Sequence, residues 1–284
     1  MKEHKIGIIG AGTMGNGIAH VFSLYDFKVT LVDIDQSILD VARTTIINNM
    51  NRQLKKGIID DIKVQNAINN IVFSKDINDL NDCDLVIEAI KEDFDIKSKV
   101  FKELDLICKD SAILASNTSS ISINKLSEVT NRPGNVIGMH FMNPVPVIKL
   151  VEIIVGKNTS QDTVSFIMDL SQLINKIPIK CNDSPGFVSN RILMPMINEA
   201  ALCYQEGVAP AESIDQIMVL GMGHPMGPLK LADLIGIDVC IYILNILYND
   251  LNNVKYKPAE ILLTMKKNNK LGKKTGEGFY NYEF

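Results

Sequence analysis

One histidine stands in an otherwise apolar run, and a glutamate occupies a similar position in the next apolar run. His140 lies in "VIGMHFMNPV" (136–145), and Glu152 lies in "KLVEIIV" (149–155). If the two runs form neighbouring strands, Glu152 can accept a hydrogen bond from one ring nitrogen of His140 and leave the other facing a substrate. The alternative is a core histidine bonded to a backbone carbonyl and a glutamate at a frayed strand end. Because a carboxylate in an apolar run is costly without a partner, we predict general acid/base chemistry.

A glycine-rich segment near the start of the chain has the spacing of a dinucleotide-binding turn. The sequence "KIGIIGAGTMGNGIAH" carries G-x-G-x-x-G as Gly10, Gly12 and Gly15, after a strand pattern and at the start of a helix pattern. Gly10 permits the tight turn, Gly12 lets the backbone approach a pyrophosphate, and Gly15 allows close helix packing. A diphosphate would lie at the helix N-terminus, where free N–H groups and the helix dipole favour anions.

A second strand pattern, "KVTLVD", ends in an acidic residue at the expected distance from the glycines. Asp33 follows Gly15 by 18 residues, about where a carboxylate would meet the adenosine ribose hydroxyls. The alternative is a glycine-rich turn with an unrelated surface aspartate. No arginine follows in "DIDQS" to pair with a 2′-phosphate, so we expect NAD rather than NADP.

Two further polar clusters lie near the ends of structural patterns. "ASNTSS" follows the strand pattern "AILAS", so Asn117 and Ser119 would stand at the same sheet edge as His140, where open α/β sheets bind ligands. Asn190 lies in a helix pattern, within "SPGFVSNRI". A turn or helix cap also explains the first cluster, and an outward polar residue explains Asn190. Neither cluster alone indicates a site.

The 284 residues are enough for two domains, and the sequence pattern changes near residue 183. Before this point apolar strand patterns alternate with helix patterns, which predicts a mainly parallel sheet with helices on both faces. The strand patterns are "KIGIIG", "KVTLVD", "IVFS", "DLVIEAI", "AILAS", "VIGMHF", "KLVEIIV" and "PIKC". The rest of the chain shows helix patterns only, at roughly 187–206, 210–220, 228–250 and 258–268. We therefore predict an α/β Rossmann-like domain over 1–183 and an all-α domain over 184–284.

The boundary between the two predicted domains carries a helix-start signal. Asp183 or Ser184, followed by Pro185, resembles an N-cap with proline in the first turn. We therefore expect the first helix of the second domain to begin there.

An insertion separates the second and third strand patterns. Nearly forty residues lie between "LVD" and "IVFS", more than a simple crossover requires, so we predict a helical arm at about 34–70. Ile47, Met50 and Leu54 would form one apolar stripe of this arm. Arg52 and Lys56 would project together from another face.

Composition and charge exclude several classes of protein. Hydrophobic residues make up 46% of the chain and charged residues 22%, as in ordinary folded proteins, and the net charge of −4 gives no general attraction to nucleic acid or anionic membranes. The five cysteines are scattered, without a spacing suited to zinc, so we expect reduced thiols and no metal ion. The first residues lack a signal-peptide pattern and no segment reaches the ~18 apolar residues of a membrane span, so we expect a cytoplasmic protein without a membrane partner.

Taken together, these motifs resemble the NAD-dependent 3-hydroxyacyl-CoA dehydrogenases, most closely the short bacterial 3-hydroxybutyryl-CoA dehydrogenases. The resemblance covers essentially the whole chain. It rests on seven ordered segments: "GAGTMGNGIA", "LVIEAI", "ASNTSS", "GMHFMNPVPVIKLVEII", "SPGFVSNRI", "GHPMGPLKLADLIGID" and "LGKKTGEGFYNY". It implies a Rossmann-like NAD-binding domain and a helical domain that forms a homodimer. An acyl-CoA would be the substrate, so that acetoacetyl-CoA and 3-hydroxybutyryl-CoA would be interconverted in butanoate or fatty acid metabolism.

The resemblance also implies roles for individual residues. His140 would be the acid/base and Glu152 its orienting partner, while Ser119 and Asn190 would contact the reacting oxygen of the substrate. Lys56 matches a CoA-contacting lysine of the arm, and Arg52 stands where close bacterial relatives have lysine, which leaves its geometry open. The residues implied to lie along the cofactor are Gly10, Gly12, Thr13, Met14, Gly15, Asp33, Glu92, Lys97, Asn117, Ser119, Asn143 and Lys274.

Alternatives to this function remain open at the level of sequence. The β-hydroxyacid dehydrogenases share the N-terminal Rossmann motif, but they act on free acids by a mechanism that depends on a lysine. The pairing of His140 with Glu152 argues against membership of that group. A non-catalytic NAD-binding relative, such as the lens crystallin that resembles this family, is a second alternative. Such a protein would not need the complete set of Ser119, His140, Glu152 and Asn190. Because the family includes NADP-preferring members, Asp33 alone does not decide between NAD and NADP.

Overall fold

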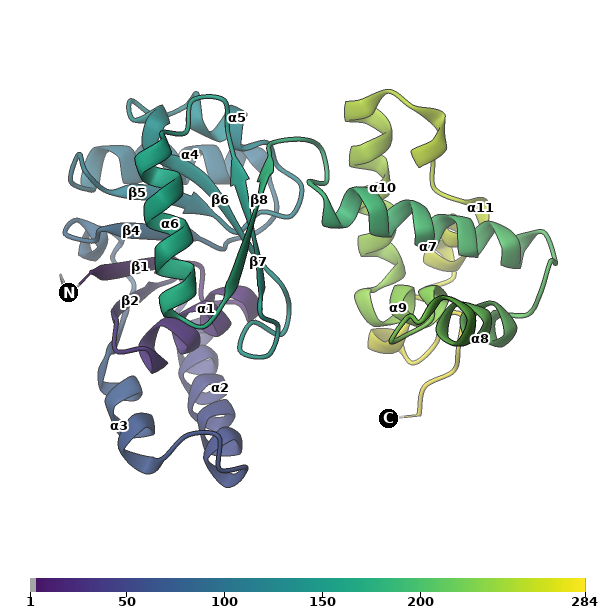
Figure 1. Cartoon of the computed structure of the whole chain (residues 1–284), viewed down its shortest axis with the longest axis horizontal. Coiled ribbons are helices and arrows are strands. Elements are labelled where there is room, and N and C mark those ends of the chain that lie inside the picture. The colour runs from purple at the N-terminus through teal and green to yellow at the C-terminus, as the bar shows by residue number, and fades with distance from the viewer. Residues whose placement is uncertain (1–3, 284) are drawn as a thin grey trace. The chain divides into compact units, whose positions relative to one another are not determined.

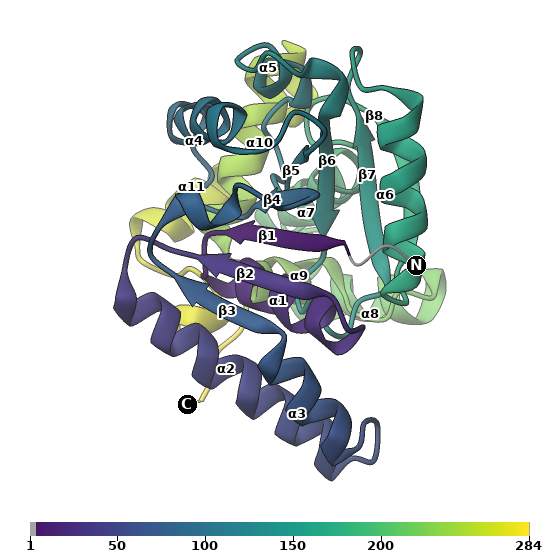
Figure 2. The same cartoon turned by 90° about the vertical axis from the view of Figure 1, so that its left-hand side faces the viewer.

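The computed structural model describes residues 4–283, which form two compact units, one ending at Ser184 and the other beginning at Pro185. The strands of the first unit are β1 (Lys5–Ile9), β2 (Lys28–Val32), β3 (Ile71–Ser74), β4 (Leu85–Glu88), β5 (Ile113–Ser116), β6 (Val136–Phe141), β7 (Leu150–Val155) and β8 (Ile177–Asn182). They form one sheet in the order β3-β2-β1-β4-β5-β6-β7-β8 (Figure 2). The first six run parallel, and β7 turns back antiparallel to β6 with β8 beside it. The predicted Rossmann-like sheet is confirmed.

Helices cover both faces of this sheet (Figure 1). The helices α1 (Thr13–Leu24), α2 (Gln36–Lys55), α3 (Asp61–Asn69) and α6 (Gln161–Leu173) share one apolar core with alternate residues of the strands. On the other face lie α4 (Phe94–Ile107) and α5 (Ile123–Ser127). Since side chains alternate along a strand, residues absent from the first core, such as those at 138 and 140, point toward the second face.

The predicted arm is present as two neighbouring helices, α2 and α3, which extend together away from the sheet (Figure 2). Two of the three residues predicted for the apolar stripe belong to it, because Met50 is fully buried and Leu54 packs against the core. Ile47 does not, since Ile46 takes its place beside the fully buried Leu39, Ala42 and Met50. The shift of one residue follows from packing against α1, which the periodicity of a mixed polar helix does not determine.

The second unit is helical, as predicted, and its helices are α7 (Ser189–Gln205), α8 (Ala211–Met222), α9 (Pro228–Ile235), α10 (Ile237–Leu251) and α11 (Glu260–Lys267). The single helix predicted at 228–250 is wrong. The chain breaks at Gly236, whose φ of 106° lies outside the helical region, and α9 and α10 are bent by 98°. Among residues 4–283 no single helix has the length and apolar character to span a membrane.

The predicted cap of the second unit's first helix is also wrong. The helix α7 begins at Ser189, and Val188 precedes it without a side-chain cap. The Asp183 carboxylate instead accepts hydrogen bonds from Ser122 Oγ (2.7 Å) and Asn124 N (2.9 Å) at the start of α5. Asp183 therefore stabilises the N-terminus of α5, whose N-cap is Ser122, rather than starting the first helix of the second unit.

One buried imidazole of the first unit lacks a hydrogen-bond partner. His20 of α1 is 1% exposed, and neither ring nitrogen has a partner among the described residues. Burial lowers the pKa of His20 to about 4, although the nearby Gln53 side chain opposes the shift, and the positive charge of Lys176 makes a smaller contribution in the same direction as burial. The ring is therefore neutral in the folded protein at pH 7.

We expect His20 to make the fold sensitive to acid. Its pKa is near 6.5 in the unfolded chain and about 4 in the folded one, so only the unfolded state binds a proton between these values. The free energy of unfolding should fall by about 3 kcal/mol on going from pH 6.5 to pH 4 because of this residue. Urea unfolding at several pH values would measure it in the wild type and in His20→Leu, which should lose that part of the slope. Equal slopes in both proteins would contradict the assignment.

Candidate active site

The antiparallel pairing of β6 and β7 places His140 directly opposite Glu152. Their side chains lie on the same face, and His140 Nδ1 is 2.8 Å from Glu152 Oε2. Both residues are buried, with exposures of 8% and 4%. An ionised Glu152 accepts from Nδ1–H, which makes Nε2 the nitrogen that can exchange a proton with another molecule. The contact predicted between these two residues is present.

The turn between β6 and β7 is what allows this pairing. Asn143 precedes Pro144 through a cis peptide bond, and the N–H groups of Val147 and Ile148 donate to the Pro144 carbonyl. Val145 packs against Gly17 of α1, where a Cβ would come within 3.0 Å of it. The turn thus packs against α1, and the strand that follows it, β7, runs back beside the strand that carries His140.

The amide of Asn117 ties the end of β5 to β6. Its Oδ1 accepts from the backbone N–H of Phe141 at 2.9 Å, and its own backbone N–H donates to Glu88 O. Asn117 therefore stands at the same sheet edge as His140, as expected for residues after parallel strands. Phe141 is 2% exposed, so its N–H has no access to bulk water.

The glycine-rich turn has the geometry of an anion cradle. Gly10 has a φ of 97°, and a Cβ at Gly15 would lie 1.7 Å from the Gly10 carbonyl oxygen, so neither position admits a side chain. A Cβ at Gly12 would meet nothing within 4 Å. Helix α1 begins at Thr13 without a side-chain cap or an acidic residue in its first turn. Its N-terminal N–H groups thus face open space suited to a phosphate.

Two of the residues expected near the cofactor have contacts of their own around this turn. Asp33 Oδ2 accepts from the backbone N–H of Ala11 at 2.8 Å, which joins the end of β2 to the glycine-rich turn. Its Oδ1 accepts from Asp35 N at 3.1 Å. Met14 packs against the apolar core, so that its backbone rather than its side chain belongs to the anion cradle. The Asp33 carboxylate is half-buried beside the α1 N-terminus.

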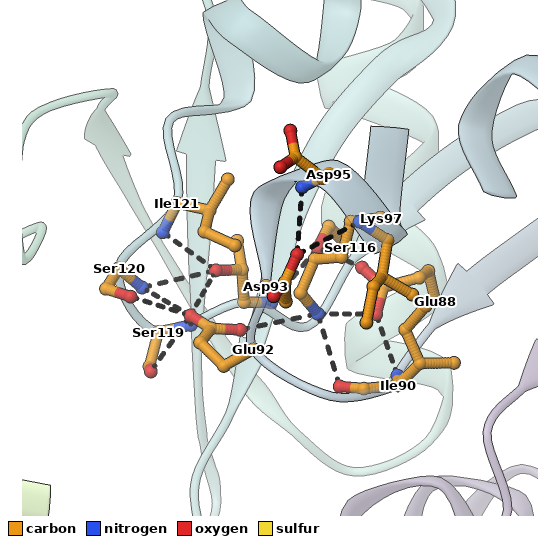
Figure 3. A network of polar contacts seen from close by, with 12 residues as sticks. Glu88, Ile90, Glu92, Asp93, Asp95, Lys97, Ser116, Ser119, Ser120 and Ile121 are labelled. Atoms are coloured by element: carbon orange, nitrogen blue, oxygen red, sulfur yellow. Dashed lines mark hydrogen bonds and ion pairs between the residues drawn. The ribbon is translucent and has the colours of Figure 1, made fainter. Parts of the chain in front are cut away.

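Ser119 lies in a turn that is organised by one carboxylate oxygen (Figure 3). Glu92 Oε1 accepts from the backbone N–H groups of Ser119 and Ser120, both at 3.0 Å, and from the hydroxyls of Thr118 (2.6 Å) and Ser120 (2.7 Å). The Ser119 hydroxyl lies 3.3 Å from the same oxygen. Burial alone would raise the pKa of Glu92, but the Lys97 charge and these donors bring it below its ordinary value. Glu92 is therefore an ionised anchor of the turn.

Behind this turn lies a buried ion pair that sequence reasoning found only in part. The side chain of Lys97, which was predicted as a cofactor residue, is 1% exposed, and its Nζ lies 2.5 Å from Glu88 Oε1 and 3.3 Å from Glu92 Oε2. Glu88, which was not predicted, is fully buried and also accepts from Ser116 Oγ at 2.6 Å and Ile90 N at 2.7 Å. Burial raises the pKa of Glu88, although the Lys97 charge opposes this. A carboxylate in the apolar run "LVIEAI" was the signal that could have identified Glu88.

A groove of about 400 Å³ runs beside the glycine-rich turn. Its walls are the N-terminal turn of α1, one face of α2 and the β6–β7 turn, with Thr13, Thr45, Asn49 and Asn143 among the lining residues. Arg52 continues the α2 face, since its Nη1 lies 3.5 Å from Asn49 Oδ1, and Lys56 follows one turn later at the helix end. Both cations are exposed. The groove and the arm therefore present polar and cationic groups along one line.

The remaining predicted site residues belong to the second unit. Asn190 is 8% exposed in the first turn of α7, and its backbone N–H donates to Gly186 O, so it is not the outward polar residue considered above. Lys274 Nζ lies 2.5 Å from Asp238 Oδ1 and close to the backbone of Gly236. Within residues 4–283 no cluster of His, Cys, Asp or Glu side chains has the arrangement of a metal site.

Known proteins resemble this chain over both units. The family model of the 3-hydroxyacyl-CoA dehydrogenase NAD binding domain matches residues 5–184, and that of the 3-hydroxyacyl-CoA dehydrogenase C-terminal domain matches residues 186–282. A probable 3-hydroxybutyryl-CoA dehydrogenase of Deinococcus radiodurans is 49% identical over 278 residues, which are 98% of this chain and 100% of that protein. A 3-hydroxybutyryl-CoA dehydrogenase of Clostridioides difficile is 46% identical over 98% of this chain and 99% of its own.

The same likeness is found among solved structures. The crystal structure of (S)-3-hydroxybutyryl-CoA dehydrogenase from Ralstonia eutropha superposes with a TM-score of 0.97 at 44% sequence identity, and 100% of both chains is covered.

We expect Asn117→Ala to destabilise the sheet edge that carries His140. The substitution leaves the buried Phe141 N–H without its acceptor, which should lower the free energy of unfolding by about 1–3 kcal/mol. Chemical denaturation measures this loss. The matched control is Asn78→Ala, because the Asn78 side-chain amide donates to the exposed Asp76, and this substitution should change stability by less than about 0.5 kcal/mol. Equal effects of the two substitutions would show that Asn117 does not hold β6.

Proposed function

We propose that this chain, which belongs to the 3-hydroxyacyl-CoA dehydrogenase family, interconverts acetoacetyl-CoA and 3-hydroxybutyryl-CoA by hydride transfer with a nicotinamide cofactor. The observation that carries the proposal is the buried pair in which His140 Nδ1 is held by Glu152 Oε2. Such a pair can remove the hydroxyl proton while the carbon gives up its hydride to the cofactor, and the two losses together convert the hydroxyl to a carbonyl. The names of the relatives support the short-chain acyl-CoA as substrate.

His140 is proposed to handle the proton and Glu152 to hold the ring. In oxidation, Nε2 removes the proton of the substrate's 3-hydroxyl, and in reduction the protonated ring returns a proton to the oxygen at that carbon. Glu152 keeps Nδ1 protonated and stabilises the imidazolium that forms in oxidation. Ser119 and Asn190 are proposed to contact the reacting oxygen. When bound, the nicotinamide supplies the hydride chemistry.

The glycine-rich turn is proposed to hold the cofactor's diphosphate. The open space at Gly12 and the uncapped N-terminus of α1 support this, because an added side chain would fill the space a phosphate needs. Asp33 would bind the adenosine ribose, and its negative charge favours NAD over a 2′-phosphorylated cofactor. Asn143 and Lys274 are proposed as further cofactor contacts. Comparing NADH with NADPH oxidation would test the preference.

The groove and the arm are proposed to receive the CoA part of the substrate. Thr45 and Asn49 line the groove, and Arg52 and Lys56 follow on the same helix, where their charges suit phosphate groups. We further propose that the second unit makes a homodimer and contributes to substrate binding. Large exposed apolar side chains on that unit support an interface between two copies: Ile192, Val208, Ile217, Leu220 and Leu234.

The two alternatives predict different activities. A β-hydroxyacid dehydrogenase would oxidise free 3-hydroxybutyrate, and a non-catalytic relative would bind NADH without consuming it. The His140–Glu152 pair argues against a β-hydroxyacid dehydrogenase, because that group is expected to use a lysine in place of such a pair. The Glu92 network around Ser119 disfavours the second, since a structural protein has no need of a hydroxyl held in place at the sheet edge that also carries an acid/base pair.

We predict that His140→Gln lowers kcat for acetoacetyl-CoA reduction by ~10²–10⁴, because glutamine occupies similar space but cannot carry the proton. The affinity for NADH should change little, since His140 is not a proposed cofactor contact. Steady-state kinetics and NADH titration measure the two effects. His4→Gln, at the amino end of β1 and away from the site edge, serves as the matched control and should keep wild-type kcat. Turnover near wild type in His140→Gln would refute the assignment.

We predict that Lys56→Ala raises the KM for acetoacetyl-CoA by about 3- to 10-fold, because it removes one exposed phosphate contact. The KM for NADH should stay within about twofold of the wild-type value. Lys102→Ala, an exposed lysine on α4, is the matched control and should leave both constants unchanged. Equal increases in both KM values would remove Lys56 from the proposed CoA site.

A further inference from the structure

A fully buried ion pair lies behind the turn that carries Ser119 (Figure 3). The side chains of Glu88 and Lys97 are 0% and 1% exposed, and their charged atoms are 2.5 Å apart. Taking two charges out of water costs several kcal/mol per ion, and replacing such a pair by apolar residues is often neutral or stabilising. Stability alone therefore does not account for the pair.

The ion pair is connected to the Ser119 turn through a second carboxylate. Lys97 Nζ also lies 3.3 Å from Glu92 Oε2, while Glu92 Oε1 gathers the N–H groups of Ser119 and Ser120. Lys97 thus holds one oxygen of the Glu92 carboxylate and the turn occupies the other. With both oxygens held, the carboxylate cannot rotate, and the Ser119 backbone is fixed relative to β4 and β5.

The position of Glu88 explains how this arrangement is anchored. Glu88 ends β4 and pairs in register with Ser116 at the end of β5. Its two oxygens accept from Lys97 Nζ, Ile90 N and Ser116 Oγ. The ammonium of Lys97 is therefore held by a residue of a rigid strand rather than of a loop. Because Lys97 is held in place, it in turn fixes the position of the Glu92 carboxylate.

We propose that Glu88 and Lys97 are positioning residues that hold the Ser119 hydroxyl in its place through Glu92. The inference rests on the proposed function, because it assumes that Ser119 contacts the reacting oxygen. The Lys97 ammonium is shared among Glu88, Glu92 and the Ile90 carbonyl, all of which belong to the first unit.

The test is a double substitution that removes both charges of the fully buried pair and leaves Glu92, whose side chain is 25% exposed to water, as the remaining carboxylate. Lys97→Met alone would leave the fully buried Glu88 carboxylate without a counter-charge, and the protein could fail to fold. Glu88→Gln combined with Lys97→Met retains an amide oxygen at 88 for the Ile90 N–H and keeps the volume at 97. Lys109→Met is the matched control, because it breaks another ion pair, with Asp84 at 2.6 Å, at the opposite edge of the sheet.

We expect the double variant to lower kcat for acetoacetyl-CoA reduction by about tenfold. In a Ser119→Ala background the same double substitution should lower kcat by less than about twofold further, because the group it positions is gone. Lys109→Met should keep wild-type kcat in both backgrounds. An equal fall in both backgrounds would overturn the proposal, and so would an unchanged kcat in the double variant.

A second measurement keeps this inference separate from the proposed function. Amide hydrogen exchange of the peptide at 115–122 reports on the Ser119 and Ser120 N–H groups that bond Glu92. In the double variant these amides should exchange about tenfold faster than in the wild type, and unchanged rates would overturn the positioning role. If the wild type failed to reduce acetoacetyl-CoA, the proposed function would fall, while the exchange rates would still decide whether the ion pair orders the turn.

Discussion

The site depends on the register between the antiparallel strands β6 and β7. His140 and Glu152 are partners in that register, and a slip of one residue would turn one of the two side chains to the opposite face. The register is held by the packing of Val145 in the β6–β7 turn against Gly17, and by the apolar side chains that alternate with the pair. One reversed strand at the end of a parallel sheet thus places a carboxylate behind an imidazole.

The neighbouring parallel strands extend this arrangement along the same sheet edge. Glu88 of β4 and Ser116 of β5 are partners in register, and the turn after β5 carries Asn117 and Ser119 toward β6. Glu88 and Ser116 are fully buried and hydrogen-bonded to each other, as low dielectric surroundings require, and the half-buried Asn117 and Ser119 are hydrogen-bonded as well. These hydrogen bonds hold the backbone of the sheet edge in one conformation. The glycine-rich turn that follows β1 lies beside this edge.

Much of the fold could be predicted from the sequence, because the β-branched runs are short, clearly separated and correctly spaced. The fold class, the family and the direct contact of His140 with Glu152 are confirmed, and the first two rest on motifs that few other families share. The helix predicted over 228–250 was wrong, because a glycine inside an apolar periodic pattern does not reveal that its φ is positive. The α2 stripe was wrong by one residue, because packing against α1 decides its phase.

The buried network was the part that the sequence could not resolve. Lys97 was predicted as a cofactor residue by resemblance, and nothing in "KEDFDIKSKV" indicates that its ammonium turns inward to Glu88. Nine residues separate the two in the sequence, and only the approach of α4 to the end of β4 brings them together. Long-range pairs of this kind depend on tertiary packing, whereas the glycine motif depends on local backbone geometry alone.

The central claim is that the His140 imidazole, held by Glu152, transfers a proton to or from the oxygen at the 3-position of an acyl-CoA. Its most direct test is NADH consumption by the wild-type protein with acetoacetyl-CoA and, separately, with free acetoacetate. Rapid consumption with the thioester and almost none with the free acid is the result this account predicts. Comparable turnover of the free acid, or NADH binding without consumption of either substrate, would contradict it.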